Sequence, residues 1–156
     1  MPVPSRCASA IVGIAFTFGC LLGAGGASAA VSLYERMGGQ TVVAAVINDT
    51  LDRVVADPRL NRSFEGSNVK RIKEKLAEQI CQLAGGGCQY TGDSMRETHA
   101  GHQITQAEFY GLVEVLRDSL RRHHVHLRER NELLALLAPM ERDVVNVAAP
   151  KSASAK

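Results

Sequence analysis

One histidine in the middle of the chain, His99, has the setting of a metal ligand. It follows a glycine-rich break at residues 85–87 and lies in a short segment, 94–100, that is predicted to form a helix. Long segments with apolar residues at helical spacing come before and after it. Neutral imidazole is a good iron ligand. A lone imidazole between helices that form an apolar slot is what a haem iron needs on its proximal side.

The other histidines offer weaker candidates. His102 lies three residues after His99 and is the rival ligand, because the two would share a face if the helix continued. Without its flanking motifs, His99 would itself be read as a polar residue on a helix surface. His123, His124 and His126 resemble a metal-binding tract, but they lie among arginines at a helix end, where a solvated patch is the commoner arrangement.

Four long helices are predicted around His99, and no segment shows a convincing alternating strand pattern. A loop at 85–92 lets the short segment that carries His99 cross beneath a cofactor. That loop favours a globin-like helical sandwich over an up-and-down bundle. The helices are expected at 42–55, ended by Asp57 and Pro58; at 68–83; at 105–120, opened by a capping box of Thr105 and Glu108; and at 133–144, which Pro139 bends or divides.

The first 29 residues are expected to be a secretory signal peptide. Arg6 precedes an apolar stretch at 11–22, and the small residues Ala-Ser-Ala follow at 27–29. An uncleaved membrane anchor is the alternative, because the uncharged run continues through a Gly- and Ala-rich tail. The expected organisation is a signal peptide at 1–29, one periplasmic or secreted domain at 30–145, and a disordered tail at 146–156.

Without residues 1–29 the chain is nearly neutral, since it loses only Arg6 from its 18 Lys and Arg and keeps all 16 Asp and Glu. Near-neutral charge gives no broad basic footprint, so nucleic acid is not expected as a partner. There is no tryptophan, so Leu, Ile, Val and Ala must build most of the core. The two remaining cysteines, Cys81 and Cys88, either form a disulfide or stay as free thiols.

Four motifs in order along the chain resemble those of the group 1 truncated haemoglobins. They are a Leu-Tyr start with paired glycines (LYERMGG, 33–39); ADPRL followed by Phe64; a second glycine pair with YTG and Met95-x-x-x-His99; and the stretch from His99 to Thr105 followed by Phe109. The resemblance covers roughly residues 32–145.

The resemblance implies an all-α, two-over-two helical sandwich that encloses haem b (iron protoporphyrin IX). His99 would be the proximal iron ligand, and Lys75 a possible distal one. The implied cofactor contacts are Phe64, Ile72, Lys75, Leu76, Tyr90, Met95, His99, Ile104, Phe109 and Leu116.

The distal side departs from the family pattern. Group 1 proteins commonly place a tyrosine and two glutamines there to hydrogen-bond bound dioxygen, whereas alignment on the glycine pairs puts Leu51, Ile72 and Leu76 at those positions. Without such a donor, bound dioxygen lacks a hydrogen bond worth roughly 1–3 kcal/mol. This implies faster oxygen release and a relative preference for CO and NO. Lys75 either pairs with a haem propionate or, as a neutral amine, becomes the sixth iron ligand. Gln79 is a further possible donor.

The leading functional expectation is a haem protein that binds the diatomic gases O2, NO and CO. An NO dioxygenase or peroxidase-like enzyme is one alternative, and an electron-transfer protein with Lys75 as sixth ligand is another. A plain helical interaction domain without haem is the remaining possibility. Expected partners are the gases, with a redox protein as a further candidate. The membrane would be a partner only through an uncleaved N-terminal segment.

Overall fold

The computed structural model describes residues 30–147, which form helices joined by turns and loops and contain no strand. The all-helical prediction is confirmed for this part of the chain. The predicted signal peptide (1–29) and residues 148–156 of the predicted tail lie outside the described residues. Between residues 30 and 147, no helix has both the length and the apolar character that a membrane crossing requires. The elements are α1 (Leu33–Arg36), α2 (Gly39–Ala56), the 3-10 helix η1 (Asn61–Phe64), α3 (Val69–Leu83), α4 (Met95–His99), α5 (Gln106–Arg122), α6 (Leu127–Leu137), the 3-10 helix η2 (Ala138–Met140) and α7 (Glu141–Val144).

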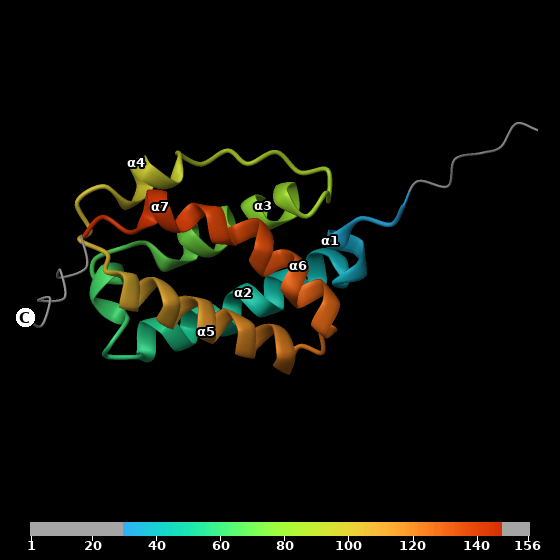
Figure 1. Ribbon diagram of the computed structural model, residues 1–156, viewed down its shortest axis with the longest axis horizontal. Helices are drawn as coiled ribbons and strands as arrows, with labels where there is room; N and C mark the ends of the chain where they lie inside the picture. The colour runs from blue at the N-terminus through green and yellow to red at the C-terminus, as the bar shows by residue number, and fades with distance from the viewer. Residues whose placement is uncertain (1–29, 148–156) are drawn as a thin grey trace, which may run out of the picture.

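Helix α2 is the centre of the packing, because it contacts both α3 and α5. Helix α5 also contacts α6 and α7, and α6 contacts α1. The short α4 lies against α7, which comes from the far end of the chain (Figure 1). The last predicted helix is divided at Pro139, as expected: α6 ends at Leu137, and α7 begins at Glu141.

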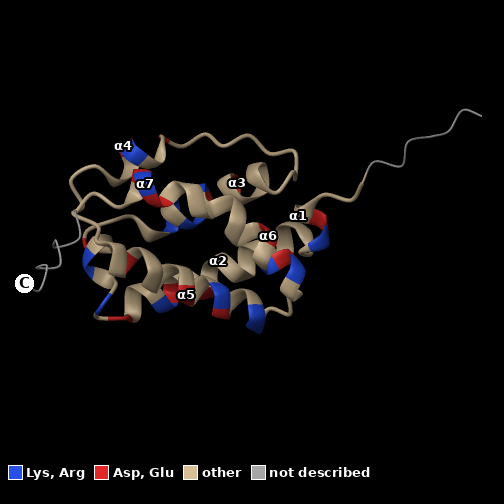
Figure 2. Ribbon diagram, viewed as in Figure 1, with Lys and Arg blue, Asp and Glu red and all other residues tan. Residues whose placement is uncertain are grey.

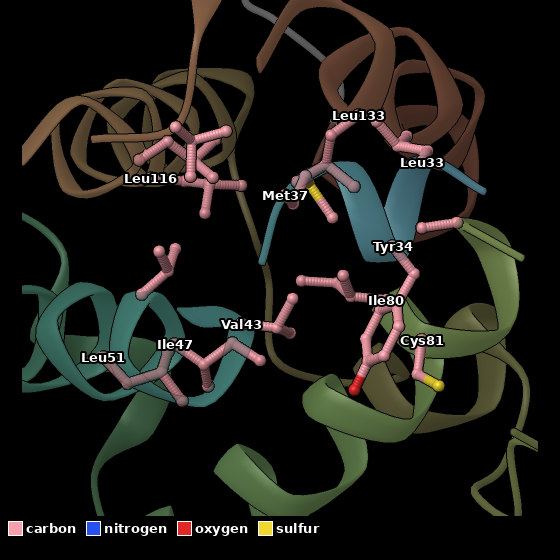
Figure 3. Close-up of a cluster of buried hydrophobic side chains, with 14 residues drawn as sticks. Leu33, Tyr34, Met37, Val43, Ile47, Leu51, Ile80, Cys81, Leu116 and Leu133 are labelled. Carbon is pink, nitrogen blue, oxygen red and sulfur yellow. The ribbon is translucent and has the colours of Figure 1, made fainter. Parts of the chain in front are cut away.

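The core lies where α1, α2, α3, α5 and α6 meet (Figure 3). Aliphatic side chains dominate it, in agreement with the lack of tryptophan. Ile47 and Leu51 of α2, Ile80 of α3 and Leu133 of α6 are each 1% exposed. Burial of such a side chain stabilises the fold by about 1.5–3 kcal/mol.

Local sequence signals fix several helix ends. The predicted capping box of Thr105 and Glu108 is present at the start of α5, and a second one, Ser94 with Glu97, opens α4. Helix α2 begins at the first glycine pair, where Gly38 has a φ of 103°. A Cβ atom on Gly38 would lie 2.4 Å from a methyl carbon of Val42, so a side chain fits there neither in conformation nor in space.

A long loop leads from α3 to α4 along the outer side of α3 (Figure 1). It begins with a disulfide between Cys81 and Cys88, whose Cα atoms are 5.7 Å apart; of the two possibilities left open by the sequence, the structure has the disulfide. The Tyr90 amide donates to the Gln82 side chain at 2.5 Å, and the Thr91 amide and hydroxyl donate to Glu78 at 3.2 and 2.8 Å. These bonds hold the loop against α3.

Candidate cofactor site

His99 is the last residue of α4, and its ring is oriented by the backbone of the same helix. Nδ1 lies 2.7 Å from the carbonyl oxygen of Met95. A carbonyl oxygen can only accept a hydrogen bond, so Nδ1 carries the proton of the neutral ring. Nε2 then keeps its lone pair for a metal ion. Burial lowers the pKa of the His99 imidazole, the Met95 carbonyl acts in the opposite direction, and nearby His102 lowers it further. The ring is therefore neutral at neutral pH, the form that binds metals.

The surroundings of His99 suit a metal that brings its own ligands. Between residues 30 and 147, no group of three or more His, Cys, Asp or Glu side chains is placed to hold a metal ion. His102 is exposed in the loop after α4. Haem iron fits such a site, because the porphyrin supplies four nitrogen ligands and the protein needs to add only one.

The predicted apolar contacts come from the four elements η1, α3, α4 and α5, and from Ile104 in the loop before α5. Phe64 of η1, with Ile72 and Leu76 of α3, packs against the core cluster that includes Leu116 of α5. All three remain half-buried, as do Met95 and Phe109, whereas Ile104 and Leu116 are 8% and 4% exposed. A wall of half-buried apolar side chains fits a flat apolar cofactor, which would remove them from water.

Tyr90 is placed differently from the other predicted contacts. It is half-buried in the α3–α4 loop, where its hydroxyl donates to the Asp93 carbonyl at 2.9 Å. Gly92 lies directly beneath the ring, since a Cβ atom there would be 2.3 Å from the Tyr90 hydroxyl oxygen. In this structure Tyr90 shapes the loop that covers α3.

The three apolar residues at the predicted distal positions are not equivalent in the structure. Leu51 is 1% exposed and belongs to the core cluster, while Ile72 and Leu76 are half-buried one turn apart on α3. The Gln79 amide points at two sulfur atoms, 3.3 Å from Met95 Sδ and 3.8 Å from Met140 Sδ. Its donor is therefore turned to α4 and η2.

The ammonium group of Lys75 is held by the α3–α4 loop. Nζ donates to both carboxylate oxygens of Glu78 at 2.9 Å and to the Thr91 hydroxyl at 2.5 Å. The hydrogen bonds from Lys75 and then from Thr91 lower the pKa of Glu78. Sequence reasoning singled out Lys75 but missed both partners. The i,i+3 spacing of Lys75 and Glu78 was the available signal.

Two residues that sequence reasoning missed hold the loop after His99. Asn146, placed in the predicted tail, donates to the His99 carbonyl and accepts from the Ile104 amide, each at 2.7 Å. Arg62 donates to the carbonyls of His102 and Gln103 at 3.2 and 2.9 Å. Asn146 and Val147, the first residues of the predicted tail, thus make backbone and side-chain hydrogen bonds to this loop.

A surface cleft of about 660 Å³ lies beside this loop and is separate from the predicted cofactor contacts. None of its lining residues is among the ten contacts implied by the resemblance. On α5 it uses Ala107 and Gly111, which lie on the opposite face of the helix from Phe109 and Leu116 at 100° per residue.

Comparisons with known proteins identify the family of the chain. The family described as bacterial-like globin matches residues 32–146. The group 1 truncated haemoglobin of Mycolicibacterium paratuberculosis is 32% identical over 120 residues, covering 77% of this chain and 88% of that protein. A group 1 truncated haemoglobin of Nostoc commune is 25% identical over 115 residues, covering 74% of this chain and 98% of that protein.

Solved structures share the fold. The truncated haemoglobin of Tetrahymena pyriformis in its Fe(III) form has a TM-score of 0.70 at 23% identity, covering 74% of this chain and 98% of that one. The 2/2 haemoglobin of Synechococcus sp. PCC 7002, whose structure has a covalently attached haem, has a TM-score of 0.69 at 26% identity, with the same coverage. The predicted two-over-two sandwich is confirmed. The chain belongs to the bacterial-like globin family and is a relative of the group 1 truncated haemoglobins.

Proposed function

We propose that this chain binds haem b with His99 as the proximal iron ligand and that it binds O2, NO and CO reversibly. The family implies haem and diatomic gases in general terms. The observation that carries the proximal assignment is the hydrogen bond from His99 Nδ1 to Met95, which leaves Nε2 of a neutral imidazole free to coordinate. No other histidine of the described residues is supported in this way by its own helix.

When bound, the haem would supply an iron atom that can take up a gas. The residues of the chain would then act as a holder and a shield. His99 would hold the iron, and the half-buried side chains of Phe64, Leu76 and Met95 would line the haem slot and exclude water. A dry apolar pocket slows oxidation of the iron, so these side chains favour reversible binding over oxidation.

The apolar distal side sets the expected gas preference. Ile72 and Leu76 offer no hydrogen-bond donor, Gln79 is turned to two methionines, and Lys75 is paired with Glu78. Bound O2 carries more negative charge than CO or NO and gains most from a donor. We therefore propose a relative preference for the less polar gases CO and NO, and not a tight oxygen store.

Lys75 remains the residue on which the alternatives depend. To become a sixth ligand, its amine would have to lose a proton and leave Glu78 and Thr91. The existing contacts with Glu78 and Thr91 favour the simpler arrangement, in which Lys75 does not bind the iron and pairs with a carboxylate, as it would with a haem propionate. Electron transfer and NO dioxygenation are the alternatives, and each would need a redox partner.

We further propose that the protein acts in the periplasm or outside the cell, as the predicted signal peptide at 1–29 suggests. The disulfide between Cys81 and Cys88 supports this location, because disulfides persist in oxidising compartments. Cytosolic nicotinamide reductants are absent there, which weakens the enzymatic alternative.

The proposal is tested by the absorption spectrum of the purified full chain with haem, compared with His99→Ala and the matched control His102→Ala. We expect a Soret band that CO shifts in the ferrous wild type and in His102→Ala, and weak haem binding in His99→Ala. A wild type without a Soret band would exclude haem binding. Loss of haem in His102→Ala but not in His99→Ala would show that His102 is the iron ligand.

A further inference from the structure

We infer that Asn146 is a positioning residue for the proximal ligand: it ties the carbonyl of His99 and the backbone of Ile104 to the C-terminal end of the fold. The inference rests on the proposed role of His99. It assigns a function to a residue that comes after the last helix, forty-seven positions from the histidine it holds.

The loop that Asn146 holds is one that needs support. Residues 100–104 connect α4 to α5, and the backbone there takes left-handed conformations at Gly101 (φ 80°) and at Gln103 (φ 53°). A left-handed conformation is unfavourable for a residue with a side chain, and it persists only where neighbouring contacts hold it. Gln103 is exposed, so packing of its own side chain does not supply those contacts.

Asn146 contacts both ends of this loop. Its Nδ2 donates to the His99 carbonyl, and its Oδ1 accepts from the Ile104 amide, both at 2.7 Å. The backbone amides of Asn146 and Val147 donate to the Ile104 carbonyl at 3.1 and 3.2 Å. One asparagine thus fixes the distance between the proposed iron ligand and Ile104, a proposed wall of the haem slot.

Arg62, in the segment after α2, supports the same loop. Its guanidinium donates to the carbonyls of His102 and Gln103 and forms an ion pair with Glu108 at 2.7 Å. The loop is therefore clamped between the segment after α2 and the C-terminal segment. Of the two clamps, only Asn146 touches the backbone of His99.

The position of His99 depends on this clamp because α4 is short. It has five residues, ends at His99, and lies against α7. The ring orientation is set by Met95, while the His99 carbonyl accepts from the His102 amide at 3.2 Å within the loop and from the Asn146 side chain at 2.7 Å, the bond that ties this end of α4 to the C-terminal segment. An asparagine amide can both donate to His99 and accept from Ile104, and an aspartate carboxylate can only accept.

The test compares Asn146→Ala and Asn146→Asp with wild type, all as full-length haem-loaded protein. The readouts are the iron–histidine stretching band of the ferrous form by resonance Raman spectroscopy and the rate of haem transfer to apomyoglobin. The matched control is Asp143→Ala. Asp143 pairs with Arg96 at 2.7 Å and so also joins α7 to α4, two helices that lie side by side in Figure 2, without touching the loop.

We expect the band to shift and broaden in both Asn146 variants and to stay unchanged in Asp143→Ala. Haem transfer should be roughly tenfold faster in Asn146→Ala, about what the loss of one to two net hydrogen bonds allows. An unchanged band in Asn146→Ala overturns the inference, even if the variant unfolds more easily. A band in Asn146→Asp that is identical to that of wild type also overturns the inference, because that variant lacks the side-chain amide that donates to the His99 carbonyl.

Failure of the proposed function would look different. In that case the wild type would show no iron–histidine band, or His99→Ala would retain one, whatever residue stands at position 146. A wild-type band that disappears in His99→Ala, together with Asn146 variants that match Asp143→Ala, would leave the proximal assignment intact and exclude the positioning role of Asn146.

Discussion

A single hydrogen-bond donor on the distal side should slow oxygen release, and Leu76 is the position to introduce it. Leu76 is half-buried on α3, one turn after Ile72, so a glutamine there would reach the slot without disturbing the fully buried core. The polar side chains on the neighbouring turn are already engaged, Lys75 with Glu78 and Gln79 with Met95. Leu76→Gln would therefore add a donor that this face of α3 now lacks.

The size of the effect follows from the value of one hydrogen bond. A donor to a partly charged acceptor is worth about 1–3 kcal/mol, which corresponds to roughly 5- to 150-fold in the rate of oxygen release. Carbon monoxide is much less polar when bound, so its release should change far less. Leu76→Met is the matched control, because it keeps an apolar side chain of similar size.

The assay is stopped-flow displacement of O2 by excess CO, with release of CO measured by displacement with NO. We expect slower O2 release in Leu76→Gln than in wild type and in Leu76→Met, with similar CO release in all three. Equal O2 release in Leu76→Gln and Leu76→Met would refute the reasoning. It would mean either that the side chain at position 76 does not face the bound gas or that another donor already forms a hydrogen bond with it.

Three further predictions concern the α3–α4 loop. Replacing Cys81 and Cys88 by serine should lower the free energy of unfolding, measured in urea, by about 2–3 kcal/mol. A reductant should then destabilise the variant no further, and a variant that a reductant destabilises as much as wild type would contradict the assigned disulfide. Lys75→Ala should leave the ferric absorption spectrum unchanged, whereas conversion from low to high spin would show that Lys75 binds the iron. Gly86→Ala should destabilise the fold by about 1–3 kcal/mol in thermal unfolding, since its Cβ would lie 2.6 Å from the Tyr34 ring; wild-type stability would show that the ring moves freely.

The features that were predictable from the sequence are those encoded locally. Helix ends follow from capping boxes, glycine pairs and Pro139, each of which acts within a few residues. The setting of His99 is similar: the Met95 carbonyl that orients it lies one turn earlier on the same helix.

The features that were missed come from contacts between distant parts of the chain. Asn146 reads as the start of a polar tail, and only the return of α7 to α4 brings it to His99. Arg62 reaches its carbonyl partners across forty residues. Lys75 was assigned two possible roles towards the cofactor, but its partner Thr91 comes from a loop whose path no local pattern predicts. The choice between a disulfide and two free thiols also depends on the path of this loop, because the loop brings Cys88 back to Cys81.

The most direct test of the central claim is chemical rescue of the proximal ligand. His99→Gly removes the imidazole, and added free imidazole can occupy the space that the side chain leaves. We predict that His99→Gly binds haem weakly and that imidazole restores both the affinity and the iron–nitrogen band of the ferrous wild type in resonance Raman spectra. A variant that binds haem as tightly as wild type without imidazole, with the same band, would contradict the account.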